Sequence, residues 1–420
     1  MRWSLAKVIR SGLPFASQAL ISISNLVIGL VLARTVSPRE YGLYVLGFSI
    51  AMIVVGVQDS LVSTPVTVRL ATATPVRKVR LLAQTRHALT SVSLLLFGAA
   101  AVWDLTLWAT STGESIRFFG TCSVVAALGW GAWDFRRTES FALGSTSRLA
   151  RIDMTYVVLV LGGFGLLLLA GQISARAVLL DVGVAGILAA AVSGGRQPFQ
   201  AARLPRLKRM MGCWWQTGRW SFGASQITWI QSQGYIYLVS GMLSIAALAA
   251  VSAARMLFAP LATLFAAWAK SSLPQLARLF GERDRSGFWR AMGVGLVLFL
   301  AINCLWGISL FAARGFVAET VFLGKYPEIM ELAGWWLFAM TMTHLRSVAA
   351  IGLRSTGGFT QLTRIAFVGA GLTCALAPPM IAWKAGVGAV AALGIVEMLA
   401  AGQCLFALVA RTRHMGNSTQ

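Results

Sequence analysis

The feature that most constrains this chain is a long apolar stretch near its start, Pro14–Ala33, that carries a polar stripe. About 20 apolar residues are enough to cross a bilayer as a helix. Gln18, Ser22 and Asn25 fall at positions i, i+4 and i+7 and therefore share one face of that helix. Each buried amide needs a hydrogen-bond partner, which lipid does not offer. The face therefore either joins neighbouring helices or lines a wet cavity.

A second, weaker copy of this stretch occurs half a chain later. Phe222–Gln233 reads FGASQITWIQSQ, and its Ala-Ser-Gln triplet ends at Gln226 as the first triplet ends at Gln18. The spacing between these two triplets also aligns Asn25 with Gln233. This spacing is close to half of the 420 residues of the chain. The sequence therefore predicts two homologous halves, an arrangement that many membrane transporters share.

The composition is that of a polytopic membrane protein. Hydrophobic residues make up 57% of the chain and charged residues only 12%, with a mean hydropathy of +0.72. A soluble domain carries roughly 25% charged residues. The hydrophobic runs predict an all-α fold of about 12 transmembrane helices, in two six-helix lobes around a central cavity. We expect the lobes at residues 1–195 and 219–420, joined by a basic cytoplasmic linker at 196–218.

The predicted spans are 12–33, 42–63, 88–109, 117–135, 153–172 and 177–195 in the first half, and 219–242, 245–268, 291–312, 332–353, 365–383 and 386–409 in the second. If the N-terminus is cytoplasmic, most of the 36 lysines and arginines fall in cytoplasmic loops, as the positive-inside rule requires. We therefore expect both termini to be cytoplasmic. The net charge of +22 then reflects topology, so no nucleic-acid partner is expected, although anionic headgroups are a further use for these charges.

The sequence offers no pattern for a cofactor or a metal. The five cysteines form no CxxC pair, the three histidines are far apart, and no GxxxxGK[ST] phosphate-binding loop is present. We therefore expect no cofactor, no metal, no ATP-driven pump and no enzyme.

Ionisable residues deep in predicted spans are candidates for function, because they are costly unless paired or wet. Arg255 lies near the middle of the span 245–268, with Ser252 on the same face. A guanidinium suits phosphate oxygens better than a lysine ammonium does. Arg255 therefore either holds the diphosphate of an anionic lipid-linked substrate or pairs with Glu397 as a structural contact.

The other ionisable candidates allow two interpretations each. Glu397 is a coupling carboxylate or the partner of Arg255 or Arg346. His344 and Arg346 are two residues apart, so we expect them to face different neighbours. Asp59 is a second coupling candidate, although a structural contact with headgroups or a basic loop is the favoured interpretation.

The seventh span repeats the polar stripe of the first. Gln226, Gln233, Tyr237 and Ser240 follow at i, i+7, i+11 and i+14, so they share one face. Two such faces related by an internal repeat favour one shared, sugar-binding cavity. The predicted cavity residues are Arg255, Gln18, Ser22, Asn25, Gln226, Gln233, Tyr237, Ser252, His344 and Arg346, with Glu397 and Asp59 for coupling.

The opening of the chain, LPFASQALISISNLVIGLVLARTVSPREYGLYVLGFSI, resembles the start of bacterial Wzx-type polysaccharide flippases of the multidrug/oligosaccharidyl-lipid/polysaccharide (MOP) exporter superfamily. The specific match covers only the start of the chain. The matching features are the Gln and Asn of the first span, Ala33-Arg34, Ser37-Pro38 and Glu40-Tyr41-Gly42.

This resemblance implies a flippase of the bacterial inner membrane that moves an undecaprenyl-diphosphate-linked oligosaccharide by alternating access. The implied partners are that substrate, membrane lipids and a polysaccharide polymerase or other assembly proteins. The alternative is a cation-coupled multidrug exporter of the same superfamily, which would need buried carboxylates in the first lobe. There we expect only Asp59, near an edge, and a cation would be repelled by Arg255. The flippase is therefore the preferred prediction.

Overall fold

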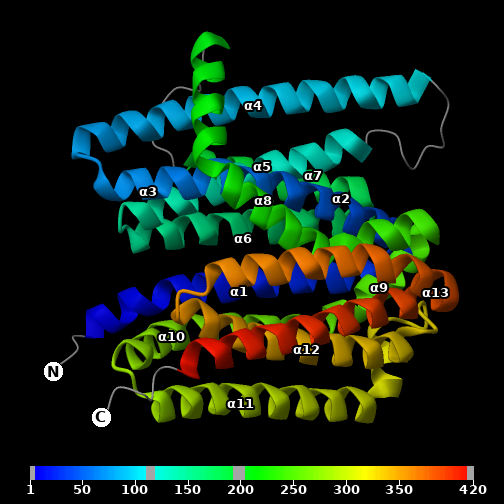
Figure 1. Ribbon diagram of the computed structural model, residues 1–420. Coiled ribbons are helices and arrows are strands. Elements are labelled where there is room, and N and C mark those ends of the chain that lie inside the picture. The colour runs from blue at the N-terminus through cyan, green and yellow to red at the C-terminus, as the bar shows by residue number, and fades with distance from the viewer. Residues whose placement is uncertain (1–4, 110–118, 193–203, 414–420) are drawn as a thin grey trace. The chain divides into compact units, whose positions relative to one another are not determined.

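The computed structural model describes residues 5–109, 119–192 and 204–413, which form helices joined by short turns, with no strand in those ranges (Figure 1). The α-helices are α1 (Leu5–Thr35), α2 (Pro38–Gln58), α3 (Thr64–Thr72), α4 (Pro75–Ala109), α5 (Phe119–Ala142), α6 (Thr146–Leu169), α7 (Ala175–Val192), α8 (Leu204–Met242), α9 (Ile245–Met256), α10 (Ala259–Gly281), α11 (Arg285–Ala312), α12 (Ile329–Ser355) and α13 (Phe359–Thr412). Two short π-helical segments are η1 (Asp59–Ser63) and η3 (Phe316–Val321).

The described residues fall into two compact units. Unit 1 contains the residues up to Ile28 and Leu43–Gln226, and unit 2 contains Gly29–Gly42 and Ile227–Gln420. One boundary lies inside α1 and another inside α8. Part of the predicted linker, 196–203, lies outside the described residues, and from Leu204 the chain is already helical in α8. The lobe boundaries at 195 and 219 stay a prediction.

The protein is an all-helical, multi-span membrane protein. Seven helices of the described part are long and apolar enough to cross a membrane, or eight if α9 and α10 count as one bent span. Helices α5, α8 and α12 also lie where spans are predicted, but they are not among these seven. Their charged and amide side chains lower the hydropathy of the helices. The count of twelve spans therefore stays a prediction.

Two predicted spans have a different form from the one expected. The span 245–268 is broken into α9 and α10, which are bent by 50° to each other. The eleventh and twelfth spans run together in α13, which is interrupted by non-helical backbone at Lys384 and Ala385. Ala385 has a positive φ of 48°, which residues other than glycine rarely adopt, so the helix is interrupted at this point.

Several helices extend past the predicted span ends. The span 117–135 continues to Ala142 in α5, and the span 153–172 begins at Thr146 in α6. Arg136, Arg137 and Arg148 therefore lie on helices, and their position on the cytoplasmic side stays a prediction. A charged helix end remains stable when its charges find partners within the protein, and these arginines do.

In unit 1 the closest helix contact is between α5 and α7, through glycines. A Cβ atom at Gly129 would lie 1.9 Å from the carbonyl oxygen of Gly183, and one at Gly186 would lie 2.4 Å from Gly129. Small residues let helix backbones approach closely in a membrane, where packing rather than the hydrophobic effect drives association. The two helices therefore form one tightly joined pair.

In unit 2, α12 packs on α13 and on α11, and α11 and α12 run side by side in Figure 1. A buried cluster around Phe288, Met292, Phe299 and Val348 joins α11 to α12. These side chains are fully or almost fully buried. Dense packing of this kind is what holds the elements around the polar residues in fixed positions.

The C-terminal end of α1, which belongs to unit 2, is capped by the segment before α12. Lys325 Nζ donates to the carbonyl oxygens of Arg34 at 2.6 Å and Val36 at 3.0 Å. A cation there satisfies free carbonyls and complements the helix dipole. Tyr326 donates to the carbonyl of Ala33 at 3.3 Å, and burial raises the pKa of Tyr326 to about 12. Lys325 is therefore a structural cap of α1.

Candidate functional site

Arg255 lies in the last turn of α9, immediately before the break to α10. α9 ends at Met256, and α10 begins at Ala259 with Pro260 in its first turn. Proline has no amide hydrogen, so it is tolerated in the first turn of a new helix but not inside a continuing one. The negative end of the α9 dipole favours a cation at this place. The half-buried Arg255 thus sits at a helix end, and not near the middle of an unbroken span as expected.

Neutral groups hold the Arg255 guanidinium. Its Nη1 donates to Gln233 Oε1 at 2.6 Å and to the Tyr235 hydroxyl at 3.0 Å. The guanidinium carbon lies 5.5 Å from the ring centroid of Trp336 and 5.7 Å from that of Tyr235. The Trp336 ring is oriented by its own bond to the carbonyl of Val251, at 2.9 Å. Aromatic faces attract a cation without neutralising it.

Among the described residues, no carboxylate forms an ion pair with Arg255. An arginine has five N–H donors, and within this part of the chain only Nη1 of Arg255 is engaged. The remaining donors form a planar fork that fits the oxygens of a phosphate or carboxylate. The site can therefore bind an anion without first breaking a salt bridge.

Glu397 pairs with Arg346, which decides between its two possible partners. The carboxylate of Glu397 is almost fully buried and forms an ion pair with Arg346 Nε, and Gln231 Nε2 donates to it at 3.3 Å. The alternative in which Glu397 neutralises Arg255 is wrong. Gln231, which the analysis of the stripe did not single out, is the buried amide of this group.

His344 lies in a packed region away from this ion pair. The ring is buried, its Nδ1 is 3.0 Å from Asn303 Nδ2, and it packs against Phe265 and Phe299 with centroid distances of 5.5 Å. Arg346 instead reaches α13. The two residues face different neighbours, as the spacing indicates.

The other predicted cavity residues are only partly brought together. Gln233 binds Arg255, and Ser252 is buried with a hydroxyl that has no hydrogen-bond partner among the described residues. Tyr237 and Gln226 are half-buried on α8. In unit 1, Ser22 donates to the backbone carbonyl of Gln18 at 2.9 Å, Asn25 is half-buried, and Asp59 is exposed at the start of η1.

In unit 1, Gln18 is bonded to an arginine that was not among the candidates. Arg137 Nη2 donates to Gln18 Oε1 at 2.9 Å. The same guanidinium forms ion pairs with Asp153 at 2.9 Å and Asp134 at 3.7 Å, and lies 4.7 Å from the ring centroid of Trp133. The polar stripe of α1 therefore meets a charged group of α5 and α6.

A second charged cluster surrounds Glu139 on α5. This buried carboxylate forms ion pairs with Arg86 of α4, with Arg136 at 3.1 Å and with Arg148 of α6 at 3.7 Å. Three arginines, from α4, α5 and α6, therefore converge on one carboxylate.

The expectation that Asp59 is the carboxylate of the first half is therefore wrong. Glu139 and Asp153 are buried there, at 2% and 1% exposure, and both are paired with arginines. They were missed because the span ends were placed at 135 and 153, where charge first appears. The sequence did contain a signal for Glu139, because Arg136 and Glu139 are three residues apart and therefore adjacent on one helix.

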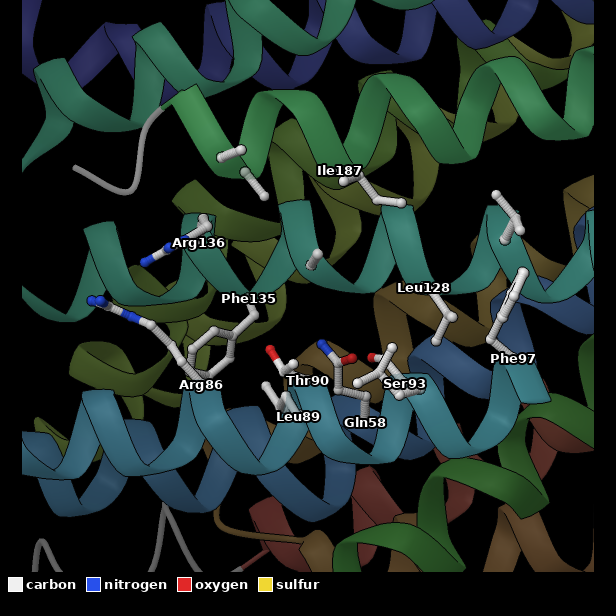
Figure 2. A pocket seen from close by; sticks show the side chains of 15 residues that line it. Gln58, Arg86, Leu89, Thr90, Ser93, Phe97, Leu128, Phe135, Arg136 and Ile187 are labelled. Atoms are coloured by element: carbon white, nitrogen blue, oxygen red, sulfur yellow. The ribbon is translucent and has the colours of Figure 1, made fainter. Parts of the chain in front are cut away.

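An apolar cavity of about 410 Å³ opens between α4, α5 and α7 of unit 1 (Figure 2). Arg86 and Arg136 lie at one end, and Phe97 and Leu128 lie toward the other. The remaining lining residues are Gln58, Leu89, Thr90, Ser93, Leu94, Val125, Ala132, Phe135, Ile187, Ala190 and Ala191. We call this cavity the α4–α5 groove.

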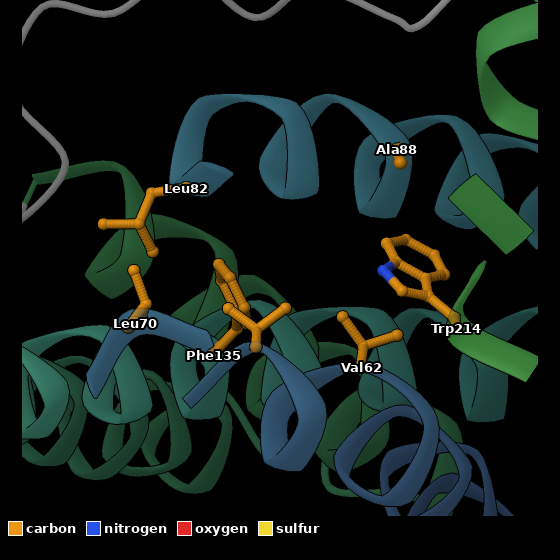
Figure 3. Close-up of a cluster of buried hydrophobic side chains, with 7 residues drawn as sticks. Val62, Leu70, Leu82, Ala88, Phe135 and Trp214 are labelled. Atoms are coloured by element: carbon orange, nitrogen blue, oxygen red, sulfur yellow. The ribbon is translucent and has the colours of Figure 1, made fainter. Parts of the chain in front are cut away.

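The basic end of α4 is anchored by a hydrophobic cluster (Figure 3). Leu82 and Ala88 of α4 pack there with Phe135 of α5. The further members are Val62, Val66, Leu70 and Trp214. Anchoring of this kind fixes the rotation of α4 around Arg86.

Within the described residues, no group of three or more His, Cys, Asp or Glu side chains is placed to hold a metal ion. The charged clusters combine arginines with carboxylates, and arginine is not a metal ligand.

No protein-family model matches the sequence, and no curated protein matches it either. Solved structures do match over nearly the whole chain. An inward-facing multidrug-resistance MATE family transporter of the MOP superfamily aligns at 12% identity and a TM-score of 0.65, covering 95% of this chain and 96% of that one. The protein has the fold of the MOP superfamily of transporters.

Two further structures agree with this fold. The lipid II flippase MurJ, in an inward closed conformation, is 11% identical with a TM-score of 0.70, over 95% of this chain and 87% of that one. A MOP superfamily transporter from Pyrococcus furiosus is 11% identical with a TM-score of 0.56, over 97% and 96%. The fold is therefore shared with structures described as a multidrug-resistance transporter and as a lipid II flippase.

Proposed function

We propose that this protein is a Wzx-type flippase, which moves an oligosaccharide linked to undecaprenyl diphosphate across the bacterial inner membrane by alternating access. The observation that carries the proposal is Arg255, a half-buried arginine without a carboxylate partner in the described part of the chain. A buried cation held only by neutral groups is costly unless an anion or water completes its environment.

The neighbours of Arg255 support a diphosphate attached to a sugar. Gln233, Tyr235 and Trp336 contact the guanidinium and hold it in a fixed orientation. Amides and aromatic rings also suit sugar hydroxyls and ring faces. In this proposal Arg255 binds the diphosphate, and Gln233 and Tyr237 contribute to the saccharide site.

The test is export by variants of Arg255 in cells that depend on this protein for a surface polysaccharide. We expect Arg255→Ala to abolish export while the protein is still inserted at normal abundance. Arg255→Lys restores charge but not the fork, so export should recover only in part. Normal export by the alanine variant at equal abundance would overturn the role of Arg255.

The second candidate is a cation-coupled multidrug exporter, and the buried acids of unit 1 favour it. Asp181 on α7 has a buried oxygen without a hydrogen-bond partner among the described residues, and Asp153 is almost fully buried. This candidate predicts that Asp181→Asn lowers resistance to cationic drugs in a sensitive strain and leaves polysaccharide export unchanged. The flippase predicts the reverse pattern for Arg255→Ala.

A further inference from the structure

The α4–α5 groove opens on an apolar surface of unit 1. Leu94, Phe97 and Ile187 line the groove and are exposed on the protein. Exposed apolar side chains on membrane-spanning helices face lipid. The groove is hence accessible to an acyl chain. Its volume of about 410 Å³ is within the range of small-molecule sites, roughly 300–1,000 Å³.

One end of the groove is positively charged. Arg86 and Arg136 line it, and Arg148 shares their carboxylate, Glu139. The three guanidinium groups thus converge on one carboxylate. The adjacent cavity beyond the arginines, about 370 Å³, is lined by Lys78, Arg86 and Arg148 and by Glu139. A ligand with an anionic head and an apolar tail therefore matches both ends of the groove.

The length of the groove matches the depth of one lipid leaflet. Arg86 and Phe97 are separated by about 16 Å along α4, at 1.5 Å per residue. Half of the hydrocarbon core of a bilayer is about 15 Å. When Phe97 lies near the bilayer centre, the arginines therefore lie at the depth of the headgroup phosphates.

We propose that the α4–α5 groove binds one anionic glycerophospholipid. Its phosphate lies at Arg136 and Arg86, and one acyl chain follows the groove past Leu89 and Leu94 toward Phe97. The charge complementarity of the basic end identifies an anionic lipid as the occupant. The binding site is independent of the transport function proposed above, because it does not involve Arg255 or unit 2.

The experiment is native mass spectrometry of the purified full-length protein, titrated with phosphatidylglycerol or phosphatidylcholine of identical acyl chains. We expect the wild-type protein to bind the first phosphatidylglycerol more tightly than the first phosphatidylcholine. A basic residue near anionic headgroups contributes about a fivefold affinity gain, from about 1 kcal/mol per charge. Arg136→Gln should therefore reduce the preference about fivefold, and Glu139 keeps Arg86 and Arg148 in this variant.

A second variant tests the acyl chain. Ala132 is exposed and lines the groove, so Ala132→Phe should fill it and weaken both lipids equally. The matched controls are Ala99→Phe and Arg80→Gln, which change exposed residues of α4 outside the groove. We expect both controls to bind like the wild type.

Three results would overturn the proposal. The first is equal binding of both lipids to the wild-type protein. The second is unchanged lipid binding by Ala132→Phe, since it would mean that the lipid does not lie in the groove. The third is loss of preference in Arg80→Gln as large as in Arg136→Gln, which would indicate a diffuse attraction of anions to the whole basic surface.

Discussion

Each of the two units holds an arginine in similar surroundings, but the charge of this arginine is balanced differently in the two. In unit 1, Arg137 contacts an amide, Gln18, and an aromatic ring, Trp133, and it is neutralised by Asp153. In unit 2, Arg255 also contacts an amide, Gln233, and aromatic rings. It has no carboxylate among the described residues. Arg137 is therefore a closed structural group, meaning that its charge is already balanced within the protein, and Arg255 can accept an anion.

The proposed internal repeat sharpens this comparison. In the predicted repeat, Arg137 corresponds in position to Arg346, because both lie on the helix of the fourth predicted span of their half, and both pair with a buried acid. An amide from the first predicted span of the same half lies beside each pair, Gln18 or Gln231. The offset that aligns Gln18 with Gln226 places Gly47 opposite Arg255. The predicted repeat therefore gives Arg255 no charged counterpart in the first half.

The largest expected effect is on stability in unit 1. Arg137→Met leaves Asp153 buried without its cation, and breaking a buried pair costs about 3 to 5 kcal/mol. The measurement is the free energy of unfolding in detergent by denaturant titration. Arg137→Met combined with Asp153→Leu should recover most of the loss. A single variant as stable as the wild type would mean that Arg137 is not a closed structural group.

The corresponding pair in unit 2 should cost less to break. Glu397→Gln leaves Arg346 uncompensated, but this side chain is 23% exposed and can reach water, so we expect a loss of about 2 kcal/mol. If Glu397 also couples transport to protons, export by the variant becomes insensitive to a collapsed proton gradient. Unchanged gradient sensitivity, with stability restored by Arg346→Met and Glu397→Leu together, would assign it to structure alone.

At Arg255 we expect a small effect on stability and a large effect on transport. Arg255→Met removes two hydrogen bonds and a cation–π contact but leaves no buried acid, so unfolding should change by only about 1 kcal/mol. Transport is nonetheless lost. A destabilisation as large as that of Arg137→Met would erase the distinction between the two arginines.

The smallest effect is expected for Tyr235→Phe. This variant removes one hydroxyl bonded to Arg255 and keeps the ring, so stability should fall by about 0.5 kcal/mol. Because the guanidinium is less well oriented, transport at limiting substrate should fall modestly, and saturating substrate should restore it. Full loss of transport would instead assign the Tyr235 hydroxyl to direct contact with the substrate.

The helices and the general class of this protein could be predicted from the sequence, because long apolar runs and short loops leave few alternatives. The ends of the helices could not. The predicted spans stop where charges begin, as at Arg136, but α5 continues because those charges find partners on α4 and α6. A hydropathy profile counts the cost of burying a charged side chain. It contains no information about the oppositely charged side chain that offsets this cost.

The candidate site shows the same limit. Arg255 and Gln233 were both selected as polar residues of predicted spans, and they lie in contact. The choice between Arg255 and Arg346 as the partner of Glu397 depends on the rotation of three helices about their axes. A single sequence does not specify these rotations. The buried Asp153 and Glu139 escaped notice because each lies beyond or at the edge of an apolar run.

The glycine contact between α5 and α7 has a consequence for the groove beside it. Backbone atoms touch at Gly129 and Gly183, so these two helices cannot slide or separate without opening a void. They form a rigid wall on one side of the groove. Any guest in this crevice is accordingly selected for its fit to an inflexible template.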